Sequence, residues 1–198
     1  LERWVPAETV APQTIHRAMR YSLFAGGKRI RPVLCIGAAE ALGAAPQGIE
    51  DAACTLEMIH TYSLIHDDLP AMDNDTLRRG RPTLHVVYGD GIAVLAGDGL
   101  QAAAFGLLAR EPAAGPDVAA RRLRALAVIA DAAGPSGMVG GQALDLEADK
   151  LGQPRLPTAD HVRHLQALKT GALLAYACDA GALLGNASPA ARAAISTR

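Results

Sequence analysis

Long apolar stretches separated by glycine and proline dominate the pattern of hydrophobic and polar positions along this chain. The stretches are broadly apolar rather than narrowly amphipathic, which is typical of helices in the middle of a bundle. Because glycine and proline end helices, the pattern predicts helices over residues 12–24, 32–42, 48–69, 83–88, 91–110, 117–132, 138–149 and 158–184. The fold class is therefore all-α, and any polar residue on these helices needs a reason to be there.

Alanine and leucine supply most of the apolar half of the 198 residues, and only 4% of the residues are aromatic, which favours helix over sheet. The net charge of −1 gives no general case for nucleic acid or for an anionic membrane as a partner. Three scattered cysteines, Cys35, Cys54 and Cys178, favour a reducing compartment and small core positions. With no signal peptide and no uninterrupted run of about 18 apolar residues, we expect a soluble, cytoplasmic protein without stable membrane insertion.

Four aspartates gather where the third predicted helix ends. Asp67 and Asp68 close a nearly all-apolar stretch, and Asp73 and Asp75 follow just past Pro70. Since proline stops the helix, the chain can turn Asp73 back towards Asp67. Clustered carboxylates repel one another unless a cation lies among them, and a ligand set made only of oxygens favours a hard ion such as Mg²⁺. Asp67 and Asp73 are the natural pair of ligands.

Arg78 and Arg79 follow the acidic cluster directly. A carboxylate cluster beside paired arginines suits a metal–diphosphate complex, because arginine donates two hydrogen bonds to one phosphate. His60 lies seven residues before Asp67, within about 20° of the same helical stripe, which places it beside the same cavity. A single helix histidine is commonly a satisfied core or surface group, however, and His66 has a weaker case because adjacency to Asp67 does not set its direction.

A basic turn precedes the second predicted helix, in the sequence Gly-Gly-Lys-Arg-Ile-Arg-Pro from Gly26 to Pro32. It places three cations, Lys28, Arg29 and Arg31, within four residues. The glycines permit positive φ, and a helix that begins at Pro32 adds unpaired N–H groups and the positive end of its dipole. These features favour a phosphate-binding turn, with a solvated basic turn as the alternative.

Two later patterns have weaker signals. Met138, Gln142, Asp145 and Asp149 recur at steps of four, three and four, so they share one helical stripe that either lines a cavity or faces solvent. Lys169, Thr170 and Gly171 lie within the last predicted helix, where threonine and glycine favour a bend. A lysine at such a bend can meet a phosphate, but this pattern by itself favours a lysine that only extends its charge to water.

Together and in this order, the motifs resemble those of trans-prenyl diphosphate synthases, close to bacterial farnesyl and geranylgeranyl diphosphate synthases. The resemblance covers nearly the whole chain. It implies that isopentenyl diphosphate is bound by Lys28, Arg31, His60 and Arg79. It implies that the allylic diphosphate is contacted by Arg78, Lys169 and Thr170, with Gln142 facing the same cavity. It further implies Mg²⁺ as cofactor, with Asp67 and Asp73 as ligands and Asp68 in support, and catalysis by Asp67, Asp73, Arg78 and Lys169.

The resemblance also implies an isoprenoid-synthase-type helical bundle around a central cavity, as one all-helical domain over residues 1–198, and a homodimer. Members of that family carry a second aspartate-rich motif on a later helix. No Asp-Asp-x-x-Asp follows Asp73 in this sequence, so we expect the C-terminal helices and half of the metal site to be missing from it.

Product length is expected to depend on Tyr62 and Ser63, which lie five and four residues before Asp67. A bulky Tyr62 favours a short product, farnesyl diphosphate, whereas the small Ser63 leaves geranylgeranyl diphosphate open. Two other functions are alternatives. A terpene cyclase shares the acidic helix end but has no second diphosphate to bind, and a non-catalytic regulatory subunit of a prenyl synthase would account for the missing acid motif.

Overall fold

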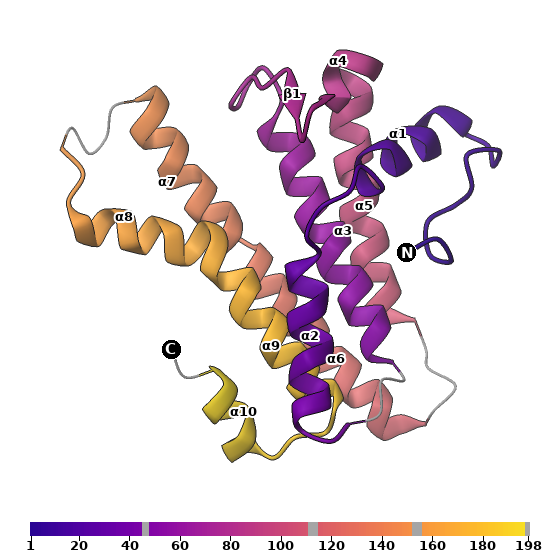
Figure 1. Cartoon of the computed structure of the whole chain (residues 1–198), viewed down its shortest axis with the longest axis vertical. Coiled ribbons are helices and arrows are strands. Elements are labelled where there is room, and N and C mark those ends of the chain that lie inside the picture. Colours follow the sequence, from indigo (N-terminus) through magenta and orange to yellow (C-terminus); the bar gives the residue numbers. More distant parts are fainter. Residues whose placement is uncertain (45–47, 111–114, 152–155, 197–198) are drawn as a thin grey trace. The chain divides into compact units, whose positions relative to one another are not determined.

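The computed structural model describes residues 1–44, 48–110, 115–151 and 156–196. Its helices are α1 (Gln13–Leu23), α2 (Ile30–Ala41), α3 (Ile49–Asp67), α4 (Leu84–Tyr88), α5 (Asp90–Ala109), α6 (Pro116–Ala133), α7 (Met138–Lys150), α8 (Ala159–Gln166), α9 (Ala172–Leu184) and α10 (Pro189–Ser196). A π-helical turn, η1 (Ala167–Gly171), joins α8 to α9, and two short strands, β1 (Leu77–Arg78) and β2 (Arg81–Pro82), form a hairpin. The prediction of an all-α fold is confirmed (Figure 1).

Every helix that the sequence predicts is present, and most ends agree within two residues. The second helix begins at Ile30 rather than at Pro32, because proline fits any position of a first turn, where its missing N–H has no partner to lose. The bend predicted at Thr170 and Gly171 is the π-helical turn η1. The sequence analysis missed the hairpin and α10, which are too short to show a hydrophobic period.

Contacts divide the chain into two compact units. Unit 1 consists of Leu1–Ile30 and Cys54–Arg110, and unit 2 consists of Arg31–Ala53 and Glu111–Arg198. The sequence-based prediction of one domain over residues 1–198 stays a prediction.

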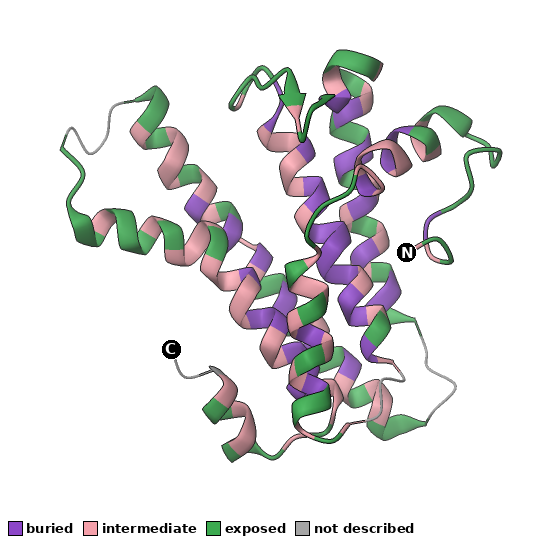
Figure 2. Ribbon diagram, in the orientation of Figure 1, coloured by how far each residue is buried: buried purple, intermediate pink, exposed green. Residues whose placement is uncertain are grey.

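In unit 1, α3 and α5 lie side by side (Figure 1), and the Thr55 hydroxyl donates to the carbonyl of Ala104 at 3.3 Å. Helices α1 and α4 pack against α5. Fully buried leucine and isoleucine side chains on these helices form the core, including Leu23, Leu56, Ile59, Leu100 and Leu107 (Figure 2). The apolar character of α3 and α5 on most sides therefore reflects burial, as the sequence pattern predicts.

In unit 2, α6 packs along α9, and the buried Tyr176 hydroxyl donates to the carbonyl of Ala125 at 2.9 Å. Small residues let these helices approach closely, with Ala125, Ala177 and Ala180 fully buried. The buried Arg122 of α6 donates to Asp51 at 2.8 Å, so its charge is paired.

Two helical runs, α5 and Ala159–Leu184, are long and apolar enough to cross a membrane by length and composition alone. Core helices of soluble proteins meet the same test, and parts of both runs are buried within their own units. Their composition is therefore weak evidence for a membrane span.

Candidate active site

The aspartate cluster forms a tight turn at the end of α3. The backbone N–H of Asp73 donates to the carbonyl of Asp67 at 2.9 Å, and that of Asn74 donates to the carbonyl of Leu69 at 3.0 Å. The chain therefore folds back on the helix end, as the position of Pro70 predicted. Asp67 is half-buried and Asp73 is exposed. Asp67 and Asp73, the two expected magnesium ligands, therefore lie in one short turn at the accessible end of a buried helix.

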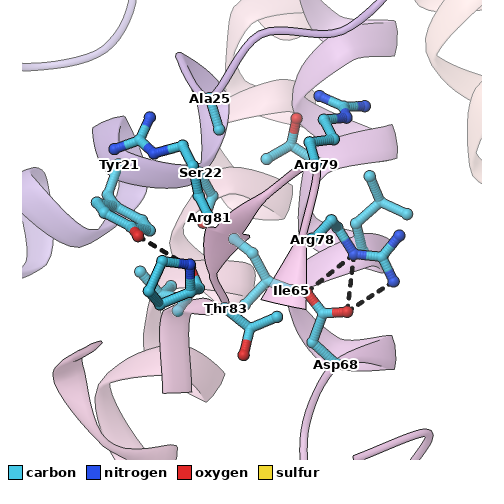
Figure 3. Close-up of a pocket in the computed structure, with 13 residues that line it drawn as sticks. Tyr21, Ser22, Ala25, Ile65, Asp68, Arg78, Arg79, Arg81 and Thr83 are labelled. Atoms are coloured by element: carbon cyan, nitrogen blue, oxygen red, sulfur yellow. Dashed lines mark hydrogen bonds and ion pairs between the residues drawn. The ribbon is translucent and has the colours of Figure 1, made fainter. Parts of the chain in front are cut away.

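Asp68, the middle aspartate, is buried and bound by Arg78. The Arg78 Nε donates to both carboxylate oxygens, at 2.7 and 3.0 Å, and its Nη2 lies 2.6 Å from Oδ1 (Figure 3). Burial raises the pKa of Asp68 above its usual range, and the hydrogen bond from Arg78 opposes that rise. The same hydrogen bond raises the pKa of Arg78. These contacts hold Arg78 in one orientation next to the acidic turn. A metal-supporting role for Asp68 stays a prediction.

A hairpin positions the two arginines. Strands β1 and β2 pair antiparallel, with Arg78 opposite Arg81. The Tyr21 hydroxyl donates to the carbonyl of Pro82 at 2.8 Å, and the Arg81 guanidinium lies 4.6 Å from the Tyr21 ring centroid, so α1 fixes the hairpin from one side. A small pocket lies between α1, α3 and the hairpin, with Asp68, Arg78 and Arg79 in its wall (Figure 3).

The basic turn is tied to the hairpin by Arg79. Its guanidinium donates to the carbonyl of Gly26, and a Cβ on Gly27 would lie 2.6 Å from Arg79 Nη1 and displace that guanidinium. The φ of 127° at Gly27 also disfavours any residue with a side chain. Lys28 is exposed. Arg29 instead turns inward and pairs with the buried Glu57 of α3. Of the cations in this turn, the structure therefore assigns Arg29 to an internal partner.

Three expected site residues lie on the last turns of α3. His60 is half-buried, and the Ser63 hydroxyl donates to its carbonyl at 2.9 Å. Tyr62 is buried, and its ring meets the His66 ring edge-on at 5.8 Å between centroids. Burial raises the pKa of Tyr62, so the phenol stays neutral. His66 lies against α5, with Nε2 3.1 Å from the carbonyl of Val94, so it packs two helices together.

The remaining expected site residues belong to unit 2. Lys169, in the π-helical turn, pairs with Asp145 of α7 at 2.5 Å. A Cβ on Gly141 would lie 2.6 Å from Lys169 Cα, so glycine is required where α7 meets this turn. Both amide atoms of Gln142 are buried and have no hydrogen-bond partner within the described part of the chain. Such a group costs free energy unless a ligand satisfies it, which favours the cavity-lining interpretation of this stripe over the solvent-facing one.

Thr170 and Arg31 complete the unit 2 set. Thr170 is exposed in the π-helical turn, and Arg31 is half-buried in the first turn of α2. π-Helical turns frequently occur at functional sites because they change the direction of one side chain within a helix. Asp149, at the far end of the α7 stripe, is exposed and 3.0 Å from Lys150, so it lies outside this group.

A family model described as "Polyprenyl synthetase" matches residues 12–197. The chain belongs to the polyprenyl synthetase family. The match includes the basic turn, the acidic turn, the hairpin arginines and the lysine of the π-helical turn. The resemblance seen in the sequence motifs is therefore confirmed.

Two curated relatives have different product names. The chain is 50% identical over 178 residues to a farnesyl diphosphate synthase from Geobacillus stearothermophilus, covering 89% of this chain and 58% of that enzyme. It is 48% identical over 176 residues to a geranylgeranyl diphosphate synthase from Cyanophora paradoxa, covering 89% of this chain and 57% of that enzyme. The chain thus spans a little over half the length of these curated relatives.

Solved structures share the fold. A farnesyl/geranylfarnesyl (FPP/GFPP) synthase from Zymomonas mobilis, in its apo form, superimposes with a TM-score of 0.89 at 39% identity, covering 98% of this chain and 68% of that one. A geranyltransferase from Legionella pneumophila gives a TM-score of 0.84 at 37% identity, covering 98% and 67% of the two chains. The helical bundle described above is therefore the fold of these polyprenyl synthetase relatives.

The aspartates of this member of the polyprenyl synthetase family fit a hard divalent cation. Asp67 and Asp73 offer only oxygen, and no group of three His, Cys, Asp or Glu side chains that could hold a metal occurs among the described residues. Mg²⁺ is commonly held by one or two carboxylates together with waters and substrate phosphates, rather than by a complete protein cage. A joined pair of aspartates next to arginine suits that mode of binding.

Sequence reasoning missed two residues that shape this site. Glu57 stands in an otherwise apolar run of α3, and that polar exception was the signal that could have found it. Gly97 of α5 lies against His66, and a Cβ there would come within 2.6 Å of the ring carbon Cδ2. No sequence signal identified Gly97, because glycine is common in this chain.

Proposed function

We propose that this chain is the substrate-binding part of a trans-prenyl diphosphate synthase, which condenses isopentenyl diphosphate with dimethylallyl or geranyl diphosphate and releases diphosphate. One observation carries the proposal. In a member of the polyprenyl synthetase family, two aspartates joined by a backbone hydrogen bond stand at the end of an apolar helix, beside a hairpin of arginines. Carboxylates for a metal and guanidinium groups for phosphate are then adjacent.

The allylic diphosphate is proposed to bind at the acidic turn. Asp67 and Asp73 would hold Mg²⁺, which when bound neutralises charge that develops on the departing diphosphate. Arg78, fixed by Asp68, donates hydrogen bonds to the same group. On unit 2, Lys169 adds a positive charge and the buried amide of Gln142 gains the partners it lacks within the described residues. Thr170 is proposed as a further contact.

Isopentenyl diphosphate is proposed to bind at the basic turn. Lys28 and Arg31 supply charge, His60 and Arg79 supply hydrogen bonds, and Arg79 already contacts the turn through Gly26. When the allylic carbon–oxygen bond breaks, the double bond of isopentenyl diphosphate attacks the resulting cation. A carbon–carbon bond forms, and one proton leaves, taken up by the released diphosphate. Apolar helix walls keep water from the cation.

The proposed product is farnesyl diphosphate. Tyr62 is buried five residues before Asp67, where a ring blocks extension of the growing chain along α3. Ser63 beside it is small and half-buried, so it offers no comparable barrier. Geranylgeranyl diphosphate is the alternative product, since relatives with either product name are almost equally similar to this chain.

We also propose a cytoplasmic homodimer. Four large apolar side chains are exposed on α4 and the first turns of α5: Val86, Val87, Val94 and Leu95. Exposed apolar patches of this kind mark protein contacts, and most soluble oligomers are symmetric copies of one chain. A second copy would cover the patch.

The test is a condensation assay on the full-length protein. Labelled isopentenyl diphosphate is mixed with dimethylallyl or geranyl diphosphate, and the products are separated by chromatography. We expect farnesyl diphosphate with Mg²⁺ and no product with EDTA. Release of diphosphate from the allylic substrate without consumption of isopentenyl diphosphate would instead indicate a terpene cyclase. An inactive protein that alters the products of an active synthase would indicate a regulatory subunit.

A further inference from the structure

A buried carboxylate on α3, Glu57, is bound by an arginine of the basic turn. The Glu57 side chain on α3 is 4% exposed, and the Arg29 guanidinium, 28% exposed, pairs with it through Nη1. Arg29 Nη2 donates to the carbonyl of Leu23 at 2.7 Å. Leu23 is the last residue of α1, where carbonyls lack helical partners and a cation is favourable. Arg29 therefore joins α1, α3 and the basic turn.

The backbone of the basic turn is held in a conformation that needs support. Gly26, Gly27 and Arg29 all have positive φ, at 85°, 127° and 50°. For arginine this left-handed conformation is sparsely populated and persists only when surrounding contacts impose it. Arg79 fixes one end of the turn through the carbonyl of Gly26. The Arg29–Glu57 ion pair fixes the other end, and Lys28 lies between the two attachments.

We propose that Arg29 and Glu57 are positioning residues, whose ion pair holds the turn so that Lys28 faces isopentenyl diphosphate. This inference rests on the proposed function. Glu57 lies one helical turn before His60 on α3, so the pair sets Lys28 at a fixed place relative to another expected ligand of the same diphosphate. Arg29 itself, engaged by a carboxylate and a carbonyl, acts through Lys28 rather than on the substrate.

The pair acts locally. Leu56, Met58 and Ile59 beside Glu57 are fully buried and keep α3 packed whether or not the carboxylate is charged. Glu57→Gln keeps the volume of the side chain and removes its charge, so it weakens the hold on Arg29 and frees the turn. The expected consequence is a loss of affinity for the substrate that Lys28 binds, with little change for the allylic substrate.

The experiment compares Glu57→Gln with Asp51→Asn in the full-length protein. Asp51 pairs with the buried Arg122 in unit 2, so Asp51→Asn breaks a comparable ion pair that includes no residue of the basic turn. For Glu57→Gln we expect the KM for isopentenyl diphosphate to rise about tenfold, which corresponds to one weakened charge-assisted hydrogen bond. We expect the KM for the allylic diphosphate to stay within about twofold, and Asp51→Asn to leave both KM values unchanged while lowering stability.

Hydrogen exchange in the ligand-free protein gives a second readout. We expect faster exchange in residues 24–30 of Glu57→Gln and unchanged exchange there in Asp51→Asn. Arg29→Lys keeps the charge but not the forked contact with Glu57 and Leu23. For this variant we expect the KM for isopentenyl diphosphate to rise about threefold. It replaces Glu57→Gln in the experiment if Glu57→Gln does not fold.

The outcomes separate the two proposals. An unchanged isopentenyl KM and unchanged exchange in the turn would overturn the positioning role, as would equal losses for both substrates together with a general loss of protection. If the wild-type protein does not condense its substrates, the proposed function fails. The positioning role is then judged by calorimetric titration with isopentenyl diphosphate. Equal dissociation constants for wild type and Glu57→Gln, or no binding to the wild type, would contradict the positioning role.

Discussion

Cations and carboxylates of the candidate site are already paired within each unit before any substrate binds. Arg78 is held by Asp68, Lys169 by Asp145, and Arg29 by Glu57. Pairing fixes the direction of long side chains, so less conformational entropy is lost when a diphosphate arrives. The cations of the three pairs have different proposed roles. Arg78 and Lys169 are proposed to meet a phosphate, whereas Arg29 remains an internal support.

Removing the carboxylate of Asp68 tests whether it serves Arg78 or a metal. For Asp68→Asn we expect kcat to fall about tenfold or more, because Arg78 loses its bidentate partner. If Asp68 acts only through Arg78, the Mg²⁺ concentration giving half-maximal rate stays the same. Kinetics at a series of Mg²⁺ concentrations measures both quantities. Asp75→Asn, which alters an exposed partner 3.6 Å from Arg78, is the control and should change little.

A marked rise in the Mg²⁺ requirement of Asp68→Asn, with Arg78→Lys unaffected in that respect, would contradict this view. Asp68 would then act on the metal, in line with the supporting role at the metal site that the sequence resemblance implies.

Shortening Tyr62 tests the proposed limit on product length. Tyr62→Ala removes a buried ring on α3, and we expect products longer than farnesyl diphosphate because the cavity deepens. Tyr62→Phe keeps the ring and should keep the product. Chromatography of the products of both variants decides the matter, and identical chain lengths for the alanine variant and the wild type would rule out Tyr62 as the barrier.

Sequence alone located the residues of the acidic turn and the basic turn, because runs such as Asp-Asp-Leu-Pro-Ala-Met-Asp are visible without a structure. It did not reveal their partners. Asp68 and Arg78 are ten residues apart and meet only because the hairpin folds back, and Arg29 and Glu57 are 28 residues apart. Side-chain pairing depends on packing between elements, which a single sequence does not encode by spacing.

Among the elements, α3 and α5 show how small residues set the approach of helices. His66 on α3 lies against α5 at Gly97, where any Cβ would displace the His66 ring, and its Nε2 lies 3.1 Å from the carbonyl of Val94. Gly141 plays the same part between α7 and the π-helical turn. Each glycine lets a helix carrying site residues come close to its neighbour, so helix packing and site geometry are determined together.

A methyl group at Gly97 is expected to push these helices apart. We expect Gly97→Ala to lower the free energy of unfolding by about 1–3 kcal/mol, because the His66 ring has to move. Gly106→Ala is a matched control on the same helix, where a Cβ meets nothing within 4 Å. There alanine is expected to stabilise by about 0.5–1 kcal/mol through its higher helix propensity. Urea denaturation measures the free energy of unfolding of both variants. Equal values for Gly97→Ala and Gly106→Ala would show that the His66 ring moves aside without cost.

Cys35 on α2 gives a prediction about pH. Burial raises the pKa of its thiol to about 12. We expect Cys35 to resist a thiol reagent at pH 8 until the protein unfolds, while the half-buried Cys54 reacts sooner. The neutral thiol favours the folded state below the unfolded pKa of about 9. This contribution is lost as the pH rises from there through about 12. Labelling followed by peptide mass spectrometry identifies the reacting cysteine, and early labelling of Cys35 would show that α2 opens.

Helix positions were predictable from glycine, proline and apolar runs, because these residues end or continue a helix wherever they occur. The start of α2 at Ile30 was not, since proline is accepted at any position of a first turn and so does not mark where the helix begins. The hairpin at residues 77–82 was expected only as a loop. Its two-residue strands depend on contacts with α1, including that from Tyr21 to Pro82.

For the whole molecule, the residues proposed to bind diphosphate are divided between the two compact units. Unit 1 carries the acidic turn, Lys28, His60 and the hairpin arginines, and unit 2 carries Arg31, Gln142 and Lys169. The family match over residues 12–197 includes both sets of residues.

The exposed apolar patch of α4 and α5 leads to a prediction about assembly. Leu95 is 55% exposed on α5, and Val86, Val87 and Val94 are exposed near it in sequence. If a second copy covers this patch, Leu95→Asp places a charge in an apolar contact and should convert dimer to monomer. Leu156→Asp is the control, because Leu156 is 84% exposed ahead of α8 in unit 2. Light scattering after size-exclusion chromatography gives the mass of each species. A monomeric wild type, or a Leu95→Asp dimer as stable as the Leu156→Asp dimer, would mean that the patch does not join two copies of this chain.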